Sequence, residues 1–376
     1  MNLTRRKFLT NASAAVGAGF IAGPGTCRAA TSSRSNNEGL TFSLLGDIHY
    51  DQLDHHDFDW VSKEHPNSIR QIESYSRITS ENLPLLMGSL KKTIQGNGCS
   101  QIVQIGDLVQ GLCGSEQLAK RHCEDAINFL RKQDFGVPFL VTKGNHDITG
   151  PGSVEAYNEF VIPFIGDSLN KNKPAAAHFS QEADSNLFVY FDAYHIESFR
   201  WFEKLLENRN PNQRLFFVVH PPVVPYNARS TWTVFGNSES GQAKRAKLVE
   251  LLGRHHAIVL CGHLHKYSLV ERATSEGAFT QLAVSSVAYH LDDEPKDLIG
   301  GLDSYHPDLV MLEPGHSPET IGNRRAAIAA EKPYIRRFDY GNFWGHAVIR
   351  VTPSGVEADI YQFLEATPWK TITLDS

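Results

Sequence analysis

Cysteine is scarce in this chain of 376 residues, which has one each at positions 27, 99, 113, 123 and 261. The four that lie beyond residue 30 are too few to build a disulfide-based scaffold of this length. Cys113 and Cys123 could pair in an oxidising compartment, but isolated buried thiols are the favoured interpretation. Because no cysteines cluster, a structural zinc site made of thiolates is also disfavoured.

The chain also lacks a basic surface signal for nucleic acid. Its formal net charge is −6, and no run of Lys and Arg is interleaved with aromatic residues. No nucleic-acid partner is therefore expected. Beyond the first thirty residues no apolar stretch is long enough to predict a membrane span, so none is expected in the mature protein. There is no internal repeat and no low-complexity tract.

The amino terminus resembles a twin-arginine export signal. Thr4-Arg5-Arg6-Lys7-Phe8-Leu9 precedes an apolar, Ala- and Gly-rich run at 12–23. We expect residues 1–30 to be the signal peptide, with a cleavage site near Ala29 and Ala30, and residues 31–39 to be a polar linker. The twin-arginine export machinery would then be a partner, and the protein would be periplasmic or secreted. Residues 1–30 carry four positive charges and no negative ones, so the net charge changes from −6 for the whole chain to −10 for the chain without them.

Five short motifs, GDIH, GDLVQG, GNHD, VVHPP and CGHLH, carry most of the functional information. Each motif follows or ends an apolar run and contains residues that bind hard or borderline metal ions; these are Asp47, His49, Asp107, Asn145, His146, His220, His263 and His265. Apolar runs that end in Gly-Asp, Gly-Asn or Gly-His are typical of buried strands followed by a tight turn. The motifs therefore predict a cleft at the carboxyl ends of the strands.

The donor atoms favour a site for two divalent ions. Carboxylate, imidazole and amide donors suit Mn, Fe, Zn or Mg. Two ions about 3.5–4 Å apart need a bridging ligand, and Asp107 is the natural bridge because a carboxylate can share its two oxygens. Such a pair lowers the pKa of bound water and makes hydroxide available near neutral pH.

At this point the chain resembles the calcineurin-like metallophosphoesterase superfamily, because all five motifs occur in that family's order between Gly46 and His265. The resemblance implies an α/β fold, a β-sandwich flanked by helices in four αββα layers. It assigns one metal to Asp47, His49, Asp107 and His265, and the other metal to Asp107, Asn145, His220 and His263. It assigns assistance of the leaving group to His146.

One position departs from two branches of this family. The protein phosphatases carry an Asp three residues after the ligand Asp, and the purple acid phosphatases carry a Tyr ligand there, whereas this chain has Gln110. A Gln amide can accept a hydrogen bond from His146 but lacks the charge that would raise its pKa. Asp147 could orient His146 instead, or could be a simple turn carboxylate. The motifs slightly favour the cyclic-nucleotide-phosphodiesterase-like branch.

A single metallophosphoesterase domain is expected over 40–376. Strands are predicted at 41–45, 101–105, 139–142, 187–191, 215–219, 258–261, 267–272, 279–284, 346–351 and 356–361, and amphipathic helices at 82–95, 116–132, 197–208 and 242–252. Loop insertions are expected near 50–80, 226–241 and 289–333. Within them Arg229 and His290 are candidate substrate contacts. No third metal is expected, and His122 is interpreted as a surface or core residue.

The sequence thus predicts an exported phosphoesterase with two divalent ions. Metal-bound hydroxide would attack the phosphorus of a small phosphodiester or phosphomonoester in line, and His146 would assist the leaving group. The alternative is a non-catalytic, metal-binding interaction module of the same fold. The motifs favour the enzyme because none of the metal ligands or the acid-like histidine is missing.

Overall fold

The computed structural model describes residues 27–28, 39–169, 174–227, 233–307 and 321–375. Most of the predicted signal and linker, and the predicted substrate contact Arg229, lie outside these described residues. Two residues of the predicted signal form β1 (Cys27–Arg28), which pairs in parallel with β5 (Phe179–Ala183).

The smaller sheet contains six strands in the described chain, in the order β15-β14-β13-β2-β3-β4. Its parallel part is β2 (Leu40–Leu45), β3 (Ile102–Gln104) and β4 (Phe139–Val141). Its antiparallel part is β13 (Gly345–Thr352), β14 (Gly355–Gln362) and β15 (Lys370–Thr373). The short turn between β13 and β14 is the hairpin that Pro353-Ser354-Gly355 predicts.

The larger sheet contains nine strands among the described residues, in the order β1-β5-β6-β7-β8-β10-β9-β12-β11. Its parallel centre is β6 (Asn186–Phe191), β7 (Arg214–Val219), β8 (Ile258–Cys261) and β10 (Ala278–Ala283). Antiparallel strands β9 (Tyr267–Ala273), β12 (Ile335–Asn342) and β11 (Lys296–Gly300) extend it. The central strands are buried along nearly their whole length and are mostly apolar, because both of their faces are covered.

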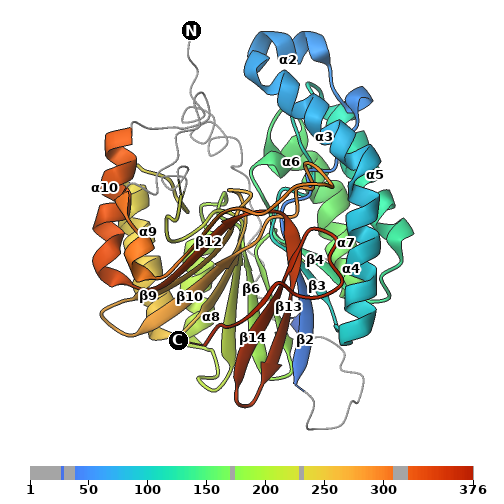
Figure 1. The fold of residues 1–376 in the computed structure, drawn as a ribbon. Coiled ribbons are helices and arrows are strands. Elements are labelled where there is room, and N and C mark those ends of the chain that lie inside the picture. The colour runs from blue at the N-terminus through green and yellow to red at the C-terminus, as the bar shows by residue number, and fades with distance from the viewer. Residues whose placement is uncertain (1–26, 29–38, 170–173, 228–232, 308–320, 376) are drawn as a thin grey trace.

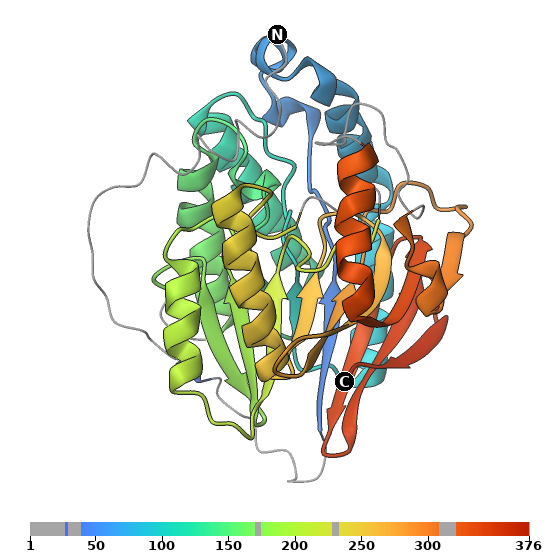
Figure 2. The same ribbon diagram turned by 90° about the vertical axis from the view of Figure 1, so that its left-hand side faces the viewer.

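The two sheets pack face to face, with helices on both outer faces (Figures 1 and 2). Phe42 of β2 meets Phe188 of β6 and Phe216 of β7 edge-on, with ring centroids 5.1 and 5.3 Å apart. Edge-to-face contacts of this kind stabilise a core by about 0.5–1.5 kcal/mol each beyond the burial of apolar area. The expected four-layer αββα fold is confirmed.

Helices of the first half of the chain lie on the side of the smaller sheet, with α2 beyond the end of its strands (Figure 1). They are α2 (Phe58–Glu64), α3 (Ile69–Glu81), α4 (Leu83–Asn97), α5 (Glu116–Gln133), α6 (Ser153–Ala156) and α7 (Ile162–Ser168). Helices of the second half lie against the larger sheet; they are α8 (Ser198–Glu207), α9 (Glu239–Arg254) and α10 (Ile321–Glu331). Ser115 caps α5 by accepting the Leu118 amide hydrogen at 3.3 Å, and Ser238 caps α9 in the same way. No helix of the described chain combines the length and the apolar character needed to cross a membrane.

All predicted strands and helices are confirmed, with ends that shift by a few residues. The interpretation of 50–80 as a loop insertion is wrong, because this segment contains α2 and α3. Ile72, Tyr75 and Ile78 recur at helical spacing on the buried face of α3, and the abundant polar residues between them hid this pattern. The predicted insertion at 289–333 also holds regular structure, in β11 and α10.

Candidate metal centre

The predicted ligands come from strands of both sheets and meet at one end of the sandwich. Asp47 and His49 follow β2, Asp107 follows β3, and Asn145 and His146 follow β4. The larger sheet contributes His220 after β7, and His263 and His265 after β8. Since these strands run parallel within each sheet, their carboxyl ends deliver the side chains to a common edge.

Four of these residues adopt the left-handed backbone conformation. His49, Asp107, His263 and His265 have φ values of 45°, 52°, 73° and 54°. This conformation costs an L-residue about 1–2 kcal/mol, although Asp and His tolerate it better than most residues. Its concentration at the strand ends produces the sharp turns that aim these side chains inward, and strain of this kind is typical of functional sites.

One donor group contains Asp47, His49, Asp107 and His265, whose ligand atoms all lie within 4.8 Å of one another. The Nε2 atoms of His49 and His265 are 2.9 Å apart. His265 Nε2 is 3.0 Å from Asp47 Oδ2, and His49 Nε2 is 3.7 Å from Asp107 Oδ2. All four side chains are buried, so their lone pairs face each other with little access for bulk water.

The second donor group contains Asp107, His220 and His263. His220 Nε2 lies 3.0 Å from Asp107 Oδ2, 3.1 Å from His263 Nδ1 and 3.2 Å from Asn145 Oδ1. Asp107 is the residue that both groups share. Its position is therefore the one that a bridging carboxylate requires.

The donor chemistry of both groups fits divalent cations. Among the described residues, the ion-pair partners of Asp47 and Asp107 are all histidines, so no Lys or Arg balances these two buried carboxylates. His220 Nδ1 donates to the carbonyl of Ile105 at 2.8 Å, which leaves Nε2 as the nitrogen facing the group. This is the arrangement that orients an imidazole for metal binding. The buried His/Asp groups thus fit a dinuclear divalent metal centre.

The negative charge of the carboxylates dominates the electrostatics of the site. Burial opposes protonation of His220, yet Asp107 and Asp47 raise its pKa to about 9. Burial also raises the pKa of Asp107, but His220 and His146 overcome this effect and hold it well below the ordinary value. The site therefore attracts positive charge.

Glycines allow the backbone to approach the carboxylates. A Cβ atom at Gly262 would lie 2.1 Å from Asp47 Oδ1, and one at Gly144 would lie 2.2 Å from Asp107 Oδ1. Both distances are far below van der Waals contact, so any larger residue would displace a predicted ligand.

His146 lies beside the first donor group. Its ring is 4.7 Å from that of His49, edge to face, and its backbone amide donates to Asp107 Oδ1 at 2.8 Å. Its Nδ1 donates to the backbone carbonyl of Gln110 at 2.8 Å, since a carbonyl can only accept. This contact fixes the tautomer and leaves Nε2 as the nitrogen that can gain or lose a second proton.

The Gln110 side chain, which could have accepted a hydrogen bond from His146, does not do so, and the acceptor is the main-chain carbonyl of this residue. Both polar atoms of the Gln110 amide are buried without a hydrogen-bond partner. Asp147 accepts the backbone amides of Gly144 and Val109, so it stabilises the loop. The turn-carboxylate interpretation of Asp147 is the one that these contacts support.

Two tyrosines that the sequence did not single out support the predicted ligands. The ring of Tyr75, on α3, stacks on His49 with centroids 4.3 Å apart and planes 8° from parallel. The Tyr289 hydroxyl lies 3.1 Å from His265 Nδ1 and 3.3 Å from the Tyr75 hydroxyl. The helical spacing within 69–81 was the signal that could have pointed to Tyr75, whereas Tyr289 follows its strand without any recognisable motif.

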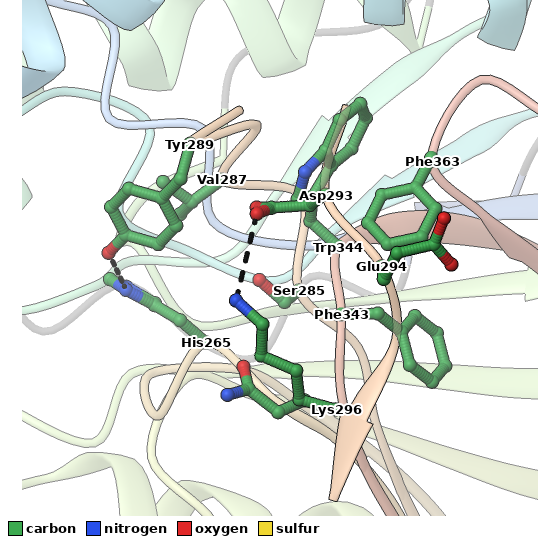
Figure 3. A pocket seen from close by; sticks show the side chains of 11 residues that line it. His265, Ser285, Val287, Tyr289, Asp293, Glu294, Lys296, Phe343, Trp344 and Phe363 are labelled. Carbon is green, nitrogen blue, oxygen red and sulfur yellow. Dashed lines mark hydrogen bonds and ion pairs between the residues drawn. The ribbon is translucent and has the colours of Figure 1, made fainter. Parts of the chain in front are cut away.

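A pocket of about 50 Å³ adjoins His265 (Figure 3). This volume has room for only a few water molecules. Tyr289 and His265 lie together on one side of the pocket, and the acidic and basic side chains of Asp293 and Lys296 form an ion pair of 3.9 Å beside them. Aromatic side chains form another part of the wall; these are Phe343, Trp344 and Phe363.

The two predicted substrate contacts have different outcomes. Arg229 lies outside the described residues, so the structure does not test it. His290 is exposed, and its backbone carbonyl accepts the indole hydrogen of Trp344 at 3.0 Å. Its side chain therefore stays a predicted contact only.

The two-sheet fold and the two donor groups of Asp and His at the strand ends define a metallophosphoesterase. The calcineurin-like phosphoesterase family matches residues 40–267, which is more than half of the chain. The chain belongs to this family, and its metal-dependent phosphoester-hydrolase class is the one that the donor groups support. A search of curated proteins found no match.

Solved structures with the same fold come from distant organisms. Purple acid phosphatase from yellow lupin seeds has 11% identity and a TM-score of 0.52, with 90% of this chain and 54% of that chain covered. A dimetal phosphatase from Danio rerio has 10% identity and a TM-score of 0.51, with 90% and 99% covered. GAP50, described as the anchor in the inner membrane complex of Plasmodium, has 13% identity and a TM-score of 0.50, with 90% and 89% covered. At such low identities, this similarity shows the fold alone.

Proposed function

We propose that this protein is an exported dinuclear metal-dependent phosphoesterase that hydrolyses a small phosphodiester or phosphomonoester. The observation that carries the proposal is the pair of buried donor groups joined by Asp107. The partners of these buried carboxylates in the described chain are histidines, and carboxylates grouped with imidazoles form the donor set that divalent cations bind. His146 at its edge adds a group suited to proton transfer.

Asp47, His49, Asp107 and His265 would hold one ion, and Asp107, Asn145, His220 and His263 would hold the other. Two divalent ions there would supply Lewis acidity and would lower the pKa of water near a bound phosphoester. The buried side chains would hold the ions and limit the access of bulk solvent. Asn145, whose side-chain oxygen faces His220, would also present its amide hydrogens to the non-bridging oxygens of the phosphoryl group.

His146 would protonate the oxygen of the departing alcohol. The Gln110 carbonyl holds its Nδ1 proton, so the ring can donate only from Nε2 when it is protonated there. That carbonyl is neutral, and it orients the ring without the full charge of a carboxylate. His146 is mostly buried beside the donor groups, but 7% of its surface is exposed, so a bound substrate could still reach its ring.

The leaving group of the substrate would extend towards the pocket beside His265. Tyr289 and the aromatic wall of that pocket favour a small, uncharged part of the leaving group, because the pocket is only about 50 Å³ in volume and its Lys296 is already paired with Asp293. Arg229 and His290 are proposed as further contacts to the phosphate. The donor set of carboxylate, imidazole and amide oxygen suits Mn, Fe, Zn or Mg.

Export rests on the first thirty residues. The paired Arg5 and Arg6, with Phe8 and Leu9 after them, support recognition by the twin-arginine machinery and a periplasmic or secreted enzyme. This route carries folded proteins, so the metals could be loaded before export. The strongly acidic mature chain supports a small-molecule substrate and argues against nucleic acid.

A second candidate function is a non-catalytic interaction module. GAP50, which shares the fold, is described as an anchor, so this fold alone does not establish catalysis. The complete donor set and the oriented His146 favour the enzyme.

The experiment compares hydrolysis of bis-p-nitrophenyl phosphate and p-nitrophenyl phosphate by the chain without residues 1–30, together with a His146→Ala variant. The enzyme predicts turnover that falls by about 10²–10⁴-fold in the variant while bound metal is retained. The ratio of the two rates assigns diesterase or monoesterase preference. Two tightly bound ions without turnover on a broad panel of phosphoesters would support the interaction module.

A further inference from the structure

A second cluster of metal-binding side chains lies next to the dinuclear site but shares no residue with it. Asp51, His55 and His122 each offer a ligand atom, and these atoms lie within 4.8 Å of one another. All three side chains are at most 1% exposed. They come from the segment after β2, from a 3-10 turn at 53–55, and from the buried face of α5.

His55 has the arrangement of a metal-binding histidine. Its Nε2 contacts Asp125 Oδ2 at 2.9 Å, so the proton belongs on Nε2 when the carboxylate is ionised. The other nitrogen, Nδ1, is buried and has no hydrogen-bond partner. A buried nitrogen lone pair without a partner costs free energy, and a cation would satisfy it. Carboxylate–histidine–metal triads pair these two nitrogens in the same way.

His122 packs against His55, with ring centroids 4.5 Å apart and planes at 29°. Its Nε2 lies 2.6 Å from the Tyr50 carbonyl and 3.5 Å from Asp51 Oδ1. Its Nδ1 lies 3.2 Å from Cys113 Sγ. In the metal-free protein Nε2 carries the proton, because the Tyr50 carbonyl can only accept a hydrogen bond. In the other tautomer Nδ1 carries the proton and donates a hydrogen bond to the Cys113 sulfur, which leaves the Nε2 lone pair to bind an ion.

Asp51 is already held in place by its neighbours. Ser76 donates to its Oδ2 at 2.8 Å, and His56 Nε2 contacts its Oδ1 at 2.7 Å. The backbone amide of Asp51 donates to Thr79 at 2.8 Å. Both Ser76 and Thr79 are on α3, so the carboxylate is oriented by the helical insertion. Such support is what a rigid ligand needs.

We propose that Asp51, His55 and His122 bind a third divalent ion, which has a structural role. The Tyr50 carbonyl is placed to serve as the fourth ligand, because it already meets His122 Nε2. Two imidazoles, one carboxylate and one carbonyl suit zinc or another borderline ion. The ion would link α5 to the segment at 51–55 that precedes α2 and α3. It would thereby stabilise α3, the helix that carries Tyr75 beside His49. This inference does not depend on the proposed phosphoesterase activity.

The first test measures bound zinc per chain, by elemental analysis after metal stripping, reloading and removal of excess ion. Wild type is compared with His55→Ala and with His65→Ala, a histidine of the same insertion that is outside the cluster. We expect His55→Ala to bind one ion fewer than both other proteins. Equal zinc in all three proteins overturns the proposal, whatever the occupancy of the dinuclear site.

A second test uses wild type alone, so it holds even if His55→Ala fails to fold. Crystals of the zinc-loaded protein are measured on both sides of the zinc absorption edge. We expect an anomalous peak between Asp51, His55 and His122, separate from any peak at Asp107. The absence of a peak there at saturating zinc overturns the proposal. A peak at this cluster without any peak at Asp107 would count against the dinuclear centre and would still support the third site.

Discussion

The main-chain carbonyl of Gln110 accepts the Nδ1 hydrogen of His146 at a distance of 2.8 Å. The group that orients the proposed general acid is therefore independent of the side chain at position 110. The amide of Gln110 is buried without a hydrogen-bond partner, so it contributes little to this orientation.

Gln110→Ala should therefore keep most of the phosphoesterase activity. We expect its kcat to stay within about tenfold of wild type, whereas His146→Ala should lose about 10²–10⁴-fold. Steady-state kinetics with one chromogenic substrate compare both variants with wild type, and bound metal is measured as the control. A Gln110→Ala variant as inactive as His146→Ala, with its metal retained, would show that the amide itself acts in the reaction.

Tyr289→Phe should weaken metal binding. The hydroxyl of Tyr289 lies 3.1 Å from His265 Nδ1, and its removal leaves this ring nitrogen without one of its partners. Loss of such a partner typically costs about 10–100-fold in metal affinity. Competition with a chelator measures the change, and Tyr334→Phe, at a half-exposed tyrosine, is the matched control. Equal affinities in both variants would contradict the supporting role of Tyr289.

Gly262→Ala should prevent correct placement of Asp47. The added Cβ would lie 2.1 Å from Asp47 Oδ1, so either the carboxylate or the turn after β8 must move. We expect loss of one bound ion and of activity. Gly96→Ala, in α4, is the matched control because its Cβ meets nothing within 4 Å. This control should be more stable than wild type by about 0.5–1 kcal/mol, as measured by denaturant unfolding, because alanine favours a helix.

Acid should destabilise the fold through His346, which lies on β13. Burial lowers the pKa of this histidine to about 4. Between its ordinary value near 6.5 and this lowered pKa, the unfolded chain binds the proton and the folded chain does not. Stability that is present at neutral pH is therefore lost as the pH falls through this window, by up to about 3 kcal/mol at its acidic end.

His346→Gln tests this pH dependence. Urea unfolding at pH 7.5 and pH 4.5 gives the free energy of unfolding for wild type and variant, so each protein is its own control. The variant should show a smaller decrease between the two pH values. An equal decrease would mean that other groups cause the acid sensitivity.

The regular core of the fold was predictable because its strands are short apolar runs that end in motif residues. β2, β7 and β8 are examples, since each is buried along nearly its whole length and is followed by a predicted ligand. α3 was missed because polar residues surround its narrow buried face. β12 was missed because the consecutive Arg336 and Arg337 interrupt its apolar residues, and its pairing with β9 depends on contacts far along the chain.

The predicted ligand set was accessible to sequence reasoning because each motif places its donors directly after a strand. The supporting residues were not accessible in this way. Tyr75 and Tyr289 are 214 positions apart and meet at His265 only in the folded chain. The acceptor of His146 was also hidden, because a main-chain carbonyl leaves no trace in residue identity.

The central claim is that two divalent ions at this site hydrolyse a phosphoester. Its most direct test is the rate at which the metal-stripped protein hydrolyses the two p-nitrophenyl phosphates as Mn²⁺, Fe²⁺, Zn²⁺ or Mg²⁺ is added, with His220→Ala measured in parallel. The dinuclear account predicts no turnover without metal and recovery with at least one of these ions. It also predicts little recovery in His220→Ala, because this residue faces Asp107 at 3.0 Å. Hydrolysis that persists after metal removal, or that is unchanged in His220→Ala, would contradict the account.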